Sequence, residues 1–479
     1  MAPEDKGPLY LALDQGGHAS RALVFDARGA TVARALREVR DFHPQPEWVE
    51  QDPEELVDSL TAVIREVEGE LGERAKRIVA AGLATQRSSI VCWDRITGGA
   101  LSPVLSWQDR RAHDWLARFA PQAEAIHAAT GLMLSPHYGA SKLRWCLDHL
   151  PRVAAAAAEK RLAMGPLASF LVFRLTEERT LAADPANAAR TLLWNIETFD
   201  WDEGLLHLFD IPRALLPACV PNRFGFGRLA GGHRPPLTLV SGDQSAALFA
   251  YGAPNAVNAY LNLGTGAFVQ RTSGDYPGQR PRLLTGIVLR DTDETVYTLE
   301  GTVNGAGAAL AWAEAELGLD DVESMLADWL EQAGEPPLFL NGVGGLGAPF
   351  WVADFASQFA GEGDARQRTV AVAESIVFLI QANLDEFQKL ASPLEGIIAS
   401  GGLAAVDPLC RRLSDLSGLP LYRPVEHEAT ARGLAWLLAG KPRDWPEPEF
   451  GSWFKPRANA ALRARYARWR SLMSAATGY

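Results

Sequence analysis

The feature that most constrains this chain is a pattern of apolar strand, glycine turn and second strand that occurs once in each half. The first copy consists of Leu9–Leu13, Asp14, Gly16-Gly17 and Arg21–Phe25, and the second consists of Ala259–Leu263, Gly264-Thr265-Gly266 and Ala267–Gln270. Short apolar runs joined by glycine turns are typical of β-hairpins. Because the same pattern occurs once near the start of each half of the sequence, it predicts a duplicated α/β architecture, with a cleft between two similar halves.

The segments around the two turns have the periodicity of α/β domains. Asp52 is expected to cap a helix, with Pro53 at the first helical position and Glu55 completing a capping box. The expected elements are a helix carrying Leu56, Leu60, Val63 and Val67, strands over Thr31–Leu36, Ile78–Ala84, Leu237–Val240 and Gly396–Ala399, and helices over Gln244–Tyr251 and Thr369–Leu390. Residues 115–235, rich in Ala and Leu, are expected to be helical insertions.

Composition excludes several classes of protein. The chain has 479 residues, 46 Lys and Arg, 58 Asp and Glu, and a formal net charge of −12. An acidic surface argues against nucleic acid as a partner, because phosphate neutralisation supplies most of that affinity. No apolar run approaches the roughly 18 residues of a membrane span. The first six residues lack the apolar core of a signal peptide, which favours a cytoplasmic location.

Metal binding by cysteine or histidine is not expected. The four cysteines form no CxxC pair, and the nine histidines form no HxxxH pair. Two aspartates at strand ends are better candidates for chemistry, because such ends face the crevice of α/β sheets. Asp243 directly precedes a helix, so it is either an N-cap or a catalytic group. Asp14 has no capping role, and Mg²⁺ or its water shell would give it one.

The glycine turns allow two interpretations. Each can be plain hairpin chemistry, or its successive N–H groups can form a nest for an anion. A third turn, Ser400-Gly401-Gly402, also follows a strand, which favours a nucleotide cradle. By contrast, Gly342-Val343-Gly344-Gly345-Leu346-Gly347 matches the dinucleotide fingerprint only in its letters. The fingerprint must open a helix, and Pro349 follows too closely for one.

Several motifs resemble, jointly and in order, the FGGY family of carbohydrate kinases, and within it the glycerol kinases. They are Leu11-Ala12-Leu13-Asp14-Gln15-Gly16, Pro46-Glu47-Trp48-Val49-Glu50-Gln51-Asp52-Pro53, Thr85-Gln86-Arg87, Ser106-Trp107-Gln108-Asp109-Arg110-Arg111, Lys142-Leu143-Arg144-Trp145, Asn187-Ala188-Ala189-Arg190-Thr191, Gly242-Asp243-Gln244, Leu299-Glu300-Gly301, Gly345-Leu346-Gly347-Ala348-Pro349-Phe350-Trp351 and Ser400-Gly401-Gly402. The resemblance implies two actin-like (ribonuclease H-like) ATPase domains with a central cleft. Residues 1–248 would bind the sugar or polyol, and residues 249–479 the nucleotide.

The resemblance also implies roles for individual residues. Asp243 matches the base that takes a proton from the substrate hydroxyl, and Asp14 matches the carboxylate near Mg²⁺. The implied ATP contacts are Gly16, Gly17, His18, Gly264, Thr265, Gly266, Gly307, Gly401 and Gly402. The implied pocket for a small polyol or sugar contains Arg87, Ser88, Trp107, His137, Asp243, Gln244 and Phe268. No nucleic acid or membrane partner is implied, and homo-oligomer formation is left open.

The chain departs from the family pattern at several of these positions. Gly17 and His18 stand where the family usually has two hydroxyl residues, and Ser400 replaces an Asp. Ser88 and His137 stand where glycerol kinases carry Glu and Tyr. Buried polar partners decide which hydroxyls a pocket accepts, so these changes predict a substrate larger than glycerol, such as a tetritol, a pentitol or a ketopentose.

Three functional classes follow. The first is an ATP- and Mg²⁺-dependent sugar or polyol kinase. The second is a catalytically weak or inactive relative that binds nucleotide or metabolite as a sensor, motivated by the changed turn residues and opposed by the intact aspartates. The third, a polymer or chaperone of the actin or Hsp70 type, lacks any segment resembling a peptide-binding domain. Within the first class, Arg21 and Thr85-Gln86-Arg87 differ from the pattern of xylulokinases.

Overall fold

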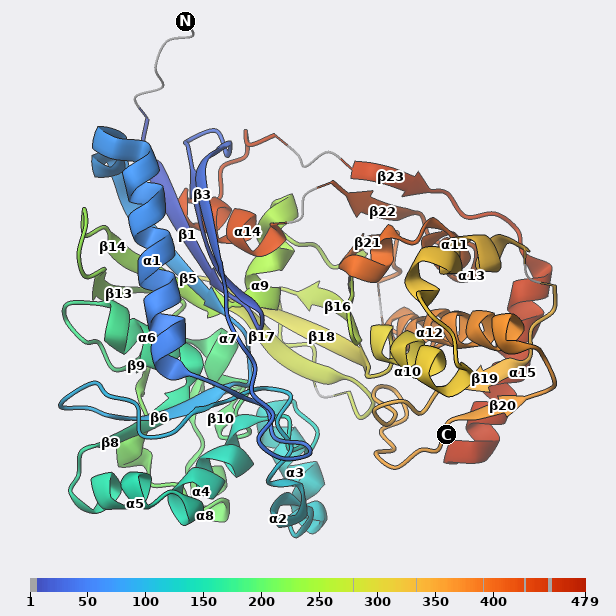
Figure 1. Ribbon diagram of the computed structural model, residues 1–479, viewed down its shortest axis with the longest axis horizontal. Coiled ribbons are helices and arrows are strands. Elements are labelled where there is room, and N and C mark those ends of the chain that lie inside the picture. The colour runs from blue at the N-terminus through green and yellow to red at the C-terminus, as the bar shows by residue number, and fades with distance from the viewer. Residues whose placement is uncertain (1–6, 279, 333, 391, 426–427, 447–449) are drawn as a thin grey trace, which may run out of the picture.

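Two large mixed β-sheets organise the chain, one in each half of the sequence (Figure 1). The computed structural model describes residues 7–278, 280–332, 334–390, 392–425, 428–446 and 450–479. In spatial order, the first sheet contains β13 (Arg223–Arg228), β14 (Pro236–Gly242), β5 (Ile78–Thr85), β1 (Leu9–Gln15), β2 (Ala19–Phe25) and β3 (Thr31–Glu38). The second contains β17 (Leu284–Arg290), β18 (Thr295–Val303), β16 (Ala267–Ser273), β15 (Asn258–Leu263), β21 (Gly396–Ser400), β22 (Leu421–Pro424) and β23 (Phe450–Phe454).

The two sheets share one plan. β1 pairs antiparallel with β2 through the first glycine turn, and parallel with β5, which pairs parallel with β14. In the same way, β15 pairs antiparallel with β16 through the second glycine turn, and parallel with β21, which pairs parallel with β22. The predicted duplicated α/β architecture is therefore confirmed. Both glycine turns lie at corresponding ends of the two central strands.

Helices cover the outer faces of both sheets and fill the space between them. On the first half they are α1 (Pro53–Leu71), α2 (His113–Ala117), α3 (Ala123–Thr130), α4 (Gly139–His149), α5 (Pro151–Ala158), α6 (Leu167–Leu175), α7 (Pro185–Ala188) and α8 (Glu203–Leu208). Further along the chain are α9 (Asp243–Ala247), α10 (Gly307–Leu317), α11 (Val322–Gln332), α12 (Ala365–Gln388), α13 (Asp407–Ser417), α14 (Ala429–Leu438) and α15 (Ala460–Thr477). Short 3₁₀-helices occur over Gly72–Arg77, Ala120–Gln122, Arg213–Leu215, Leu248–Tyr251 and Gly402–Ala405.

Helix α1 begins where the sequence predicts, with one difference. The Asp52 carboxylate accepts from the Glu54 N–H at 2.9 Å, and Pro53 opens the helix. The predicted capping box is wrong, because the Glu55 carboxylate instead accepts from Arg40 Nε at 3.0 Å. The apolar stripe of α1 is buried against the first sheet, with Leu60 and Val63 fully covered.

Helices α9 and α14 lie between the two sheets (Figure 1). One apolar cluster joins them to both halves of the molecule: Ala12 and Ala84 come from the first sheet, Tyr260 and Ile398 from the second, and Leu434 from α14. Because this cluster spans both sheets, it fixes the loops at the ends of β1 and β14 relative to those at the ends of β15 and β21.

The expectation for residues 115–235 is only partly correct. The segment does contain α3 to α8, but β8 (Leu162–Pro166) joins a third sheet with β6 (Ile90–Asp94), β7 (Val104–Leu105) and β4 (Glu50–Gln51). Two-stranded pairs are β9 (Ala182–Ala183) with β12 (Ala218–Cys219), β10 (Trp194–Asn195) with β11 (Asp200–Trp201), and, later in the chain, β19 (Leu338–Leu340) with β20 (Gln358–Ala360). β13 also belongs to the first main sheet. It lies in the segment expected to form helical insertions, but burial of Phe226 and pairing with β14 hold it as an edge strand.

The glycine-rich segment over residues 342–347 and the apolar character of the helices bear on two sites that the sequence argues against. The glycines of Gly342-Val343-Gly344-Gly345-Leu346-Gly347 form turns, and no helix starts there, so a dinucleotide site of the Rossmann type is absent at this place. Within the described ranges, none of the helices combines the length and apolar character that crossing a bilayer requires.

Candidate active site

A cavity of about 210 Å³ lies between the two sheets and receives residues from both halves. Its lining is Asp243, Gln244, Ala247, Leu248, Tyr251, Tyr260, Leu261, Asn262, Gln270, Ile398, Ser400, Ala429 and Thr430. The predicted base, Asp243, therefore shares one cavity with Ser400, which precedes the third glycine turn. This is the arrangement that transfer of a group from a nucleotide to a second substrate requires.

Asp243 stands at the first position of α9, directly after β14. Its Oδ1 accepts from the Gln244 N–H at 2.6 Å, and its side chain is 27% exposed, on the side of the cavity. The N-cap alternative is wrong, because Gly242 occupies the N-cap position. Burial raises the pKa of Asp243, and Arg87, whose Nε lies 4.0 Å from Oδ1, opposes that rise. A raised pKa makes this carboxylate a stronger base once it is ionised.

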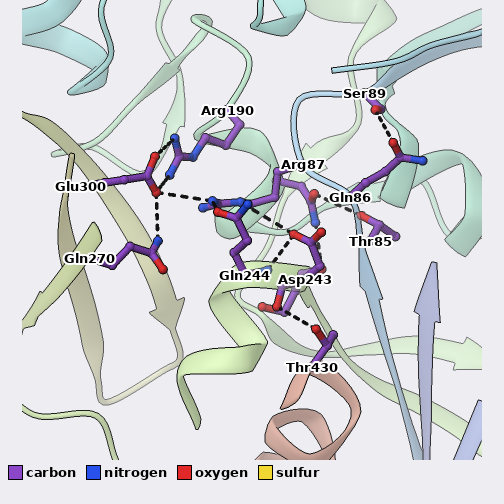
Figure 2. Close-up of polar contacts among 12 residues, drawn as sticks. Thr85, Gln86, Arg87, Ser89, Arg190, Asp243, Gln244, Gln270, Glu300 and Thr430 are labelled. Carbon is purple, nitrogen blue, oxygen red and sulfur yellow. Dashed lines mark hydrogen bonds and ion pairs between the residues drawn. The ribbon is translucent and has the colours of Figure 1, made fainter. Parts of the chain in front are cut away.

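Arg87 connects the two halves at this point (Figure 2). Its Nη2 donates to Gln244 Oε1 and, at 3.4 Å, to Glu300 on β18. Glu300 also accepts two hydrogen bonds from Arg190, at 3.0 and 2.6 Å, and one from Gln270 at 2.9 Å. Burial disfavours the charge on Glu300, but Arg190 and Arg87 outweigh it and lower its pKa to about 2. Glu300 is thus a permanent anion that orients Arg87 beside Asp243.

A buried lysine holds together the segments that carry Ser88, Trp107 and His137, three predicted pocket residues that are not part of the lining of the 210 Å³ cavity. Lys142 on α4 is fully buried, and its Nζ donates to three backbone carbonyls: Ser88 at 3.2 Å, Ser106 at 2.7 Å and His137 at 2.8 Å. Burial lowers the pKa of Lys142 to about 7, although Asp109 opposes the change. Ser88 has φ +66°, a backbone region that L-residues rarely adopt. The bond from Lys142 to its carbonyl helps to hold that conformation.

The rings of His137 and Trp107 meet edge to face, with centroids 5.4 Å apart. Burial lowers the pKa of His137 well below its usual value, and Lys142 and Arg190 add to the effect. His137 is therefore neutral at physiological pH and offers one donor and one acceptor rather than a charge. The structure brings Ser88, Trp107 and His137 together, as the sequence predicts.

Asp14 lies on β1 opposite Arg21, whose Nη1 is 3.4 Å from Oδ2. Burial, and after it the charge of Asp243, raise the pKa of Asp14 to about 7, although Arg21 opposes the rise. Asp14 Oδ1 is buried and has no hydrogen-bond partner in the described part of the chain. Over the same residues, no three His, Cys, Asp or Glu side chains gather as a metal cage. Mg²⁺ takes few carboxylates together with phosphate oxygens, so this donor set fits the ion.

The glycine turns of the second half are shaped by close backbone packing. The Gly264–Gly266 turn lies on the start of α10, where the Gly307 N–H donates to Gly264 O at 3.0 Å. A Cβ on Gly307 would lie 2.9 Å from the same oxygen. Gly401 has φ +91°, and a Cβ there would lie 2.4 Å from Leu263 O. These predicted nucleotide residues are therefore adjacent, and the Gly307 N–H is already bonded within the protein.

Three predicted residues make fewer contacts with the rest of the site. The His18 side chain is 84% exposed, and its Nδ1 lies 3.6 Å from Asp41 Oδ2. Phe268 lies on β16, two residues before Gln270, so both side chains are on one face of the strand. No side chain would hinder a Cβ on Gly402, which has open space around it. Their roles toward ATP or substrate stay predictions.

Sequence reasoning gave no role to four buried polar residues that complete this site. Arg190, Glu300 and Lys142 occur in the motifs that carry the family resemblance, and Gln270 does not. A signal was present, because Glu300 interrupts an apolar strand and Lys142 lies among buried helix positions. Charged side chains are rarely buried unless they are paired, so such positions indicate a polar network. Which partners meet there depends on long-range packing.

Comparison with known proteins supports a family assignment. Residues 9–241 match the N-terminal domain of the FGGY family of carbohydrate kinases, and residues 259–440 match its C-terminal domain. The chain is 37% identical to glycerol kinase of Aromatoleum aromaticum, over 98% of this chain and 99% of that protein. It is 38% identical to glycerol kinase of Trichlorobacter lovleyi, over 90% and 89% of the two chains.

Solved structures give the same fold. Glycerol kinase of Plasmodium falciparum, solved with ADP, superposes with a TM-score of 0.85 at 24% identity, and covers 98% of this chain and 99% of its own. A xylulose kinase from Brucella ovis superposes with a TM-score of 0.86 at 22% identity, with the same coverage. The chain belongs to the FGGY family of carbohydrate kinases and is an ATP-dependent phosphotransferase that acts on an alcohol group of a small polyol or sugar.

Proposed function

We propose that the substrate is a polyol or sugar of four or five carbons, phosphorylated by Mg²⁺·ATP in the cavity between the two sheets. The observation that carries this proposal is the position of Asp243, which faces that cavity between Arg87 and Gln244. The polar groups of Arg87 and Gln244 would hold substrate hydroxyls, with Trp107 and Phe268 as apolar walls.

The proposed chemistry assigns one step to each side chain. Asp243 takes the proton of the attacking hydroxyl, and Arg87 keeps that carboxylate oriented through the Glu300 anion. The turns at Gly16 and Gly264–Gly266 are proposed to face the phosphates, and the turn at Gly401-Gly402 the adenosine. Mg²⁺ held near Asp14 would neutralise charge on the transferred phosphoryl group. In-line placement and charge stabilisation supply most of the acceleration in reactions of this kind.

The preference for a substrate larger than glycerol rests on Ser88 and His137. The Ser88 side chain is short, uncharged and buried at a position predicted to face the substrate, and His137 is neutral. A longer substrate can place additional hydroxyls in the volume that a Glu and a Tyr would otherwise fill. A pocket without partners for glycerol's hydroxyls gains little from binding glycerol, and one unmatched polar group can change specificity by about 10²–10⁵.

A substrate panel tests both levels of this proposal. ATP consumption is measured with glycerol, tetritols, pentitols, aldoses and ketoses, and the highest kcat/KM is expected for a four- or five-carbon compound. The double variant Ser88→Glu, His137→Tyr should move the preference toward glycerol. A wild type that prefers glycerol to every longer compound contradicts the size argument. Turnover with none of the compounds contradicts the kinase assignment and favours a nucleotide-binding sensor.

Domain roles, location and assembly belong to the same proposal. We propose a boundary near residue 248, with substrate bound by residues 1–248 and nucleotide by residues 249–479; the two matched family segments, 9–241 and 259–440, support a division there. Arg190 and Glu300 meet across that boundary, so the two parts share the pocket. The supply of ATP supports work in the cytoplasm. Homo-oligomer formation stays open, and no nucleic acid or membrane partner is proposed.

A further inference from the structure

A buried network of side-chain amides connects the Gly16-Gly17 turn to the substrate pocket. Gln15, Gln51 and Gln86 come from three separate segments, and each is at most 2% exposed. Gln86 Nε2 donates to Gln51 Oε1 at 2.7 Å and to Gln15 Oε1 at 3.2 Å. Gln86 is thus the residue through which the other two are joined.

The far ends of the two outer glutamines hold the turn itself. Gln15 Nε2 donates to the carbonyl oxygen of Gly16 at 2.7 Å. Gln51 Nε2 donates to the carbonyl oxygen of Gly17 at 2.6 Å. Both consecutive carbonyls of the turn are therefore bound from within the protein.

The other end of the network reaches Trp107, which is predicted to line the substrate pocket. Gln86 Oε1 accepts from the Ser89 hydroxyl at 3.0 Å, and Ser89 Oγ accepts from the Trp107 N–H at 3.0 Å. Every hydrogen bond in this series is donated in the same direction, from Trp107 toward the glycine turn. Hydrogen bonds aligned in one direction polarise one another, and each amide has only one orientation that satisfies all its partners.

Holding the carbonyls determines where the N–H groups of the turn point. In a trans peptide the C=O and N–H bonds point in opposite directions. The Gly16 carbonyl shares its peptide with the Gly17 N–H, and the Gly17 carbonyl shares its peptide with the His18 N–H. Both N–H groups are therefore directed away from Gln15 and Gln51, and in the described part of the chain neither has an acceptor. A Cβ on Gly17 would meet nothing within 4 Å, so the turn is open on that side.

We propose that Gln86 is a positioning residue which, through Gln15 and Gln51, aims the N–H groups of Gly17 and His18 at the terminal phosphate of ATP. The inference rests on the proposed placement of the phosphates at this turn. It matters more here than in a turn with hydroxyl side chains, because Gly17 has no side chain and the backbone must supply the donors. Through Ser89, the same residue sets Trp107 relative to the turn, so substrate and phosphate are positioned together.

Two substitutions separate the donor role of Gln86 from its volume. Gln86→Glu keeps the shape and the acceptor for Ser89, but it has no N–H for Gln51 or Gln15. Gln86→Met keeps a similar volume and loses all three side-chain hydrogen bonds. Both variants should lower kcat about 10- to 100-fold, because small misplacements of reacting groups have effects of that size. The matched control is Gln381→Met, which removes a buried amide on α12 that donates to Asp385 at 2.8 Å, away from the site.

Nucleotide affinity gives a readout that a merely structural role would not move. By titration calorimetry without sugar or polyol, the affinity for β,γ-imido-ATP should fall about tenfold in both Gln86 variants, while the affinity for ADP changes less than about twofold. Gln381→Met should leave the ratio of the two affinities unchanged. If the Gln86 variants do not fold, Gln51→Glu, which removes only the donor to Gly17 O, should show the same selective loss.

An unchanged ratio of triphosphate to ADP affinity in folded Gln86 or Gln51 variants, with unchanged kcat, overturns the inference. An equal loss of affinity for β,γ-imido-ATP and for ADP also overturns it, because that result indicates a general disturbance of the nucleotide site rather than misdirected N–H groups at the terminal phosphate. These outcomes are distinct from failure of the proposed function, which the substrate panel reports with the wild type alone. The calorimetric arm holds whichever sugar or polyol is the substrate.

Discussion

The proposed substrate side and the proposed nucleotide side of this cleft are built in different ways. The substrate side consists of charged and polar side chains that are buried and paired, centred on Glu300 and Lys142. The nucleotide side consists of backbone turns, in which Gly307 and Gly401 are required because a Cβ would overlap a carbonyl oxygen. A substitution on the first side removes a hydrogen-bond partner, whereas a substitution on the second changes shape. Substitutions on the first side should therefore raise KM for the sugar or polyol, and substitutions on the second should raise KM for ATP.

The largest effect is expected at Asp243, where the two sides meet. Asp243→Asn keeps the size and removes the base, so kcat should fall ~10²-fold or more with little change in either KM. Steady-state kinetics on the best substrate of the panel provide the measurement, and thermal melting shows whether the fold is intact. A folded variant with wild-type turnover contradicts the assignment of Asp243 as base.

Asp14 should affect metal use on the nucleotide side and leave substrate binding alone. Removing the carboxylate in Asp14→Asn should raise the Mg²⁺ concentration needed for half-maximal rate ~10-fold or more, since the ion is the largest local charge. KM for the sugar or polyol should stay within about twofold of the wild type. An unchanged Mg²⁺ requirement removes Asp14 from the phosphate site.

The same variant should have a signature in stability. The folded-state pKa of Asp14 is raised to about 7 from 3.8, so between these values the folded state binds more protons than the unfolded state. Stability therefore falls as pH rises from about 4 to 7, and the loss is complete above 7. Without Mg²⁺, Asp14→Asn should be more stable than the wild type at pH 8 by roughly 4 kcal/mol, because each unit of pKa difference corresponds to about 1.4 kcal/mol. The difference should vanish near pH 4, and melting curves at the two pH values decide it.

These two aspartates also show how far the sequence alone can go. Their positions at strand ends, and the repeated strand and turn plan, follow from local patterns, and both are found in the structure. Glu300 and Lys142 could be suspected from their charge within apolar segments, but Glu300 pairs with Arg190, 110 residues away, and Lys142 donates to the carbonyl of Ser106, 36 residues away. Such pairings are decided by tertiary packing. The same reason explains β13, which lies in the segment expected to be helical but pairs with β14 and buries Phe226.

A substitution at Lys142 tests whether the proposed substrate side acts independently of the nucleotide side. Lys142→Met keeps the aliphatic stem and removes the donors to the carbonyls of Ser88, Ser106 and His137. Leaving these acceptors unmatched should lower stability by about 2–3 kcal/mol. KM for the sugar or polyol should rise ~10-fold as the three wall segments shift, while KM for ATP stays unchanged. The control is Lys389→Met, whose ammonium is exposed and pairs with Glu386 at the end of α12. A rise in KM for ATP as large as that for the sugar contradicts a role confined to this wall.

Gly307 tests the nucleotide side, with the smallest expected effect. In Gly307→Ala the new Cβ would lie 2.9 Å from Gly264 O, so the Gly264–Gly266 turn must move by a few tenths of an ångström. Overpacking of this kind should lower stability by about 1–3 kcal/mol. KM for ATP should rise ~2- to 5-fold, with KM for the sugar unchanged, because a small shift of the turn displaces donors proposed to face phosphate.

The matched control is Gly69→Ala inside α1, where a Cβ meets nothing within 4 Å. That change should raise stability by ~0.5–1 kcal/mol, because alanine loses less entropy in a helix, and should alter neither KM. If Gly307→Ala changes the KM for sugar as much as that for ATP, the two sides of the cleft are not independent, and the Gly264 turn must be assigned to both.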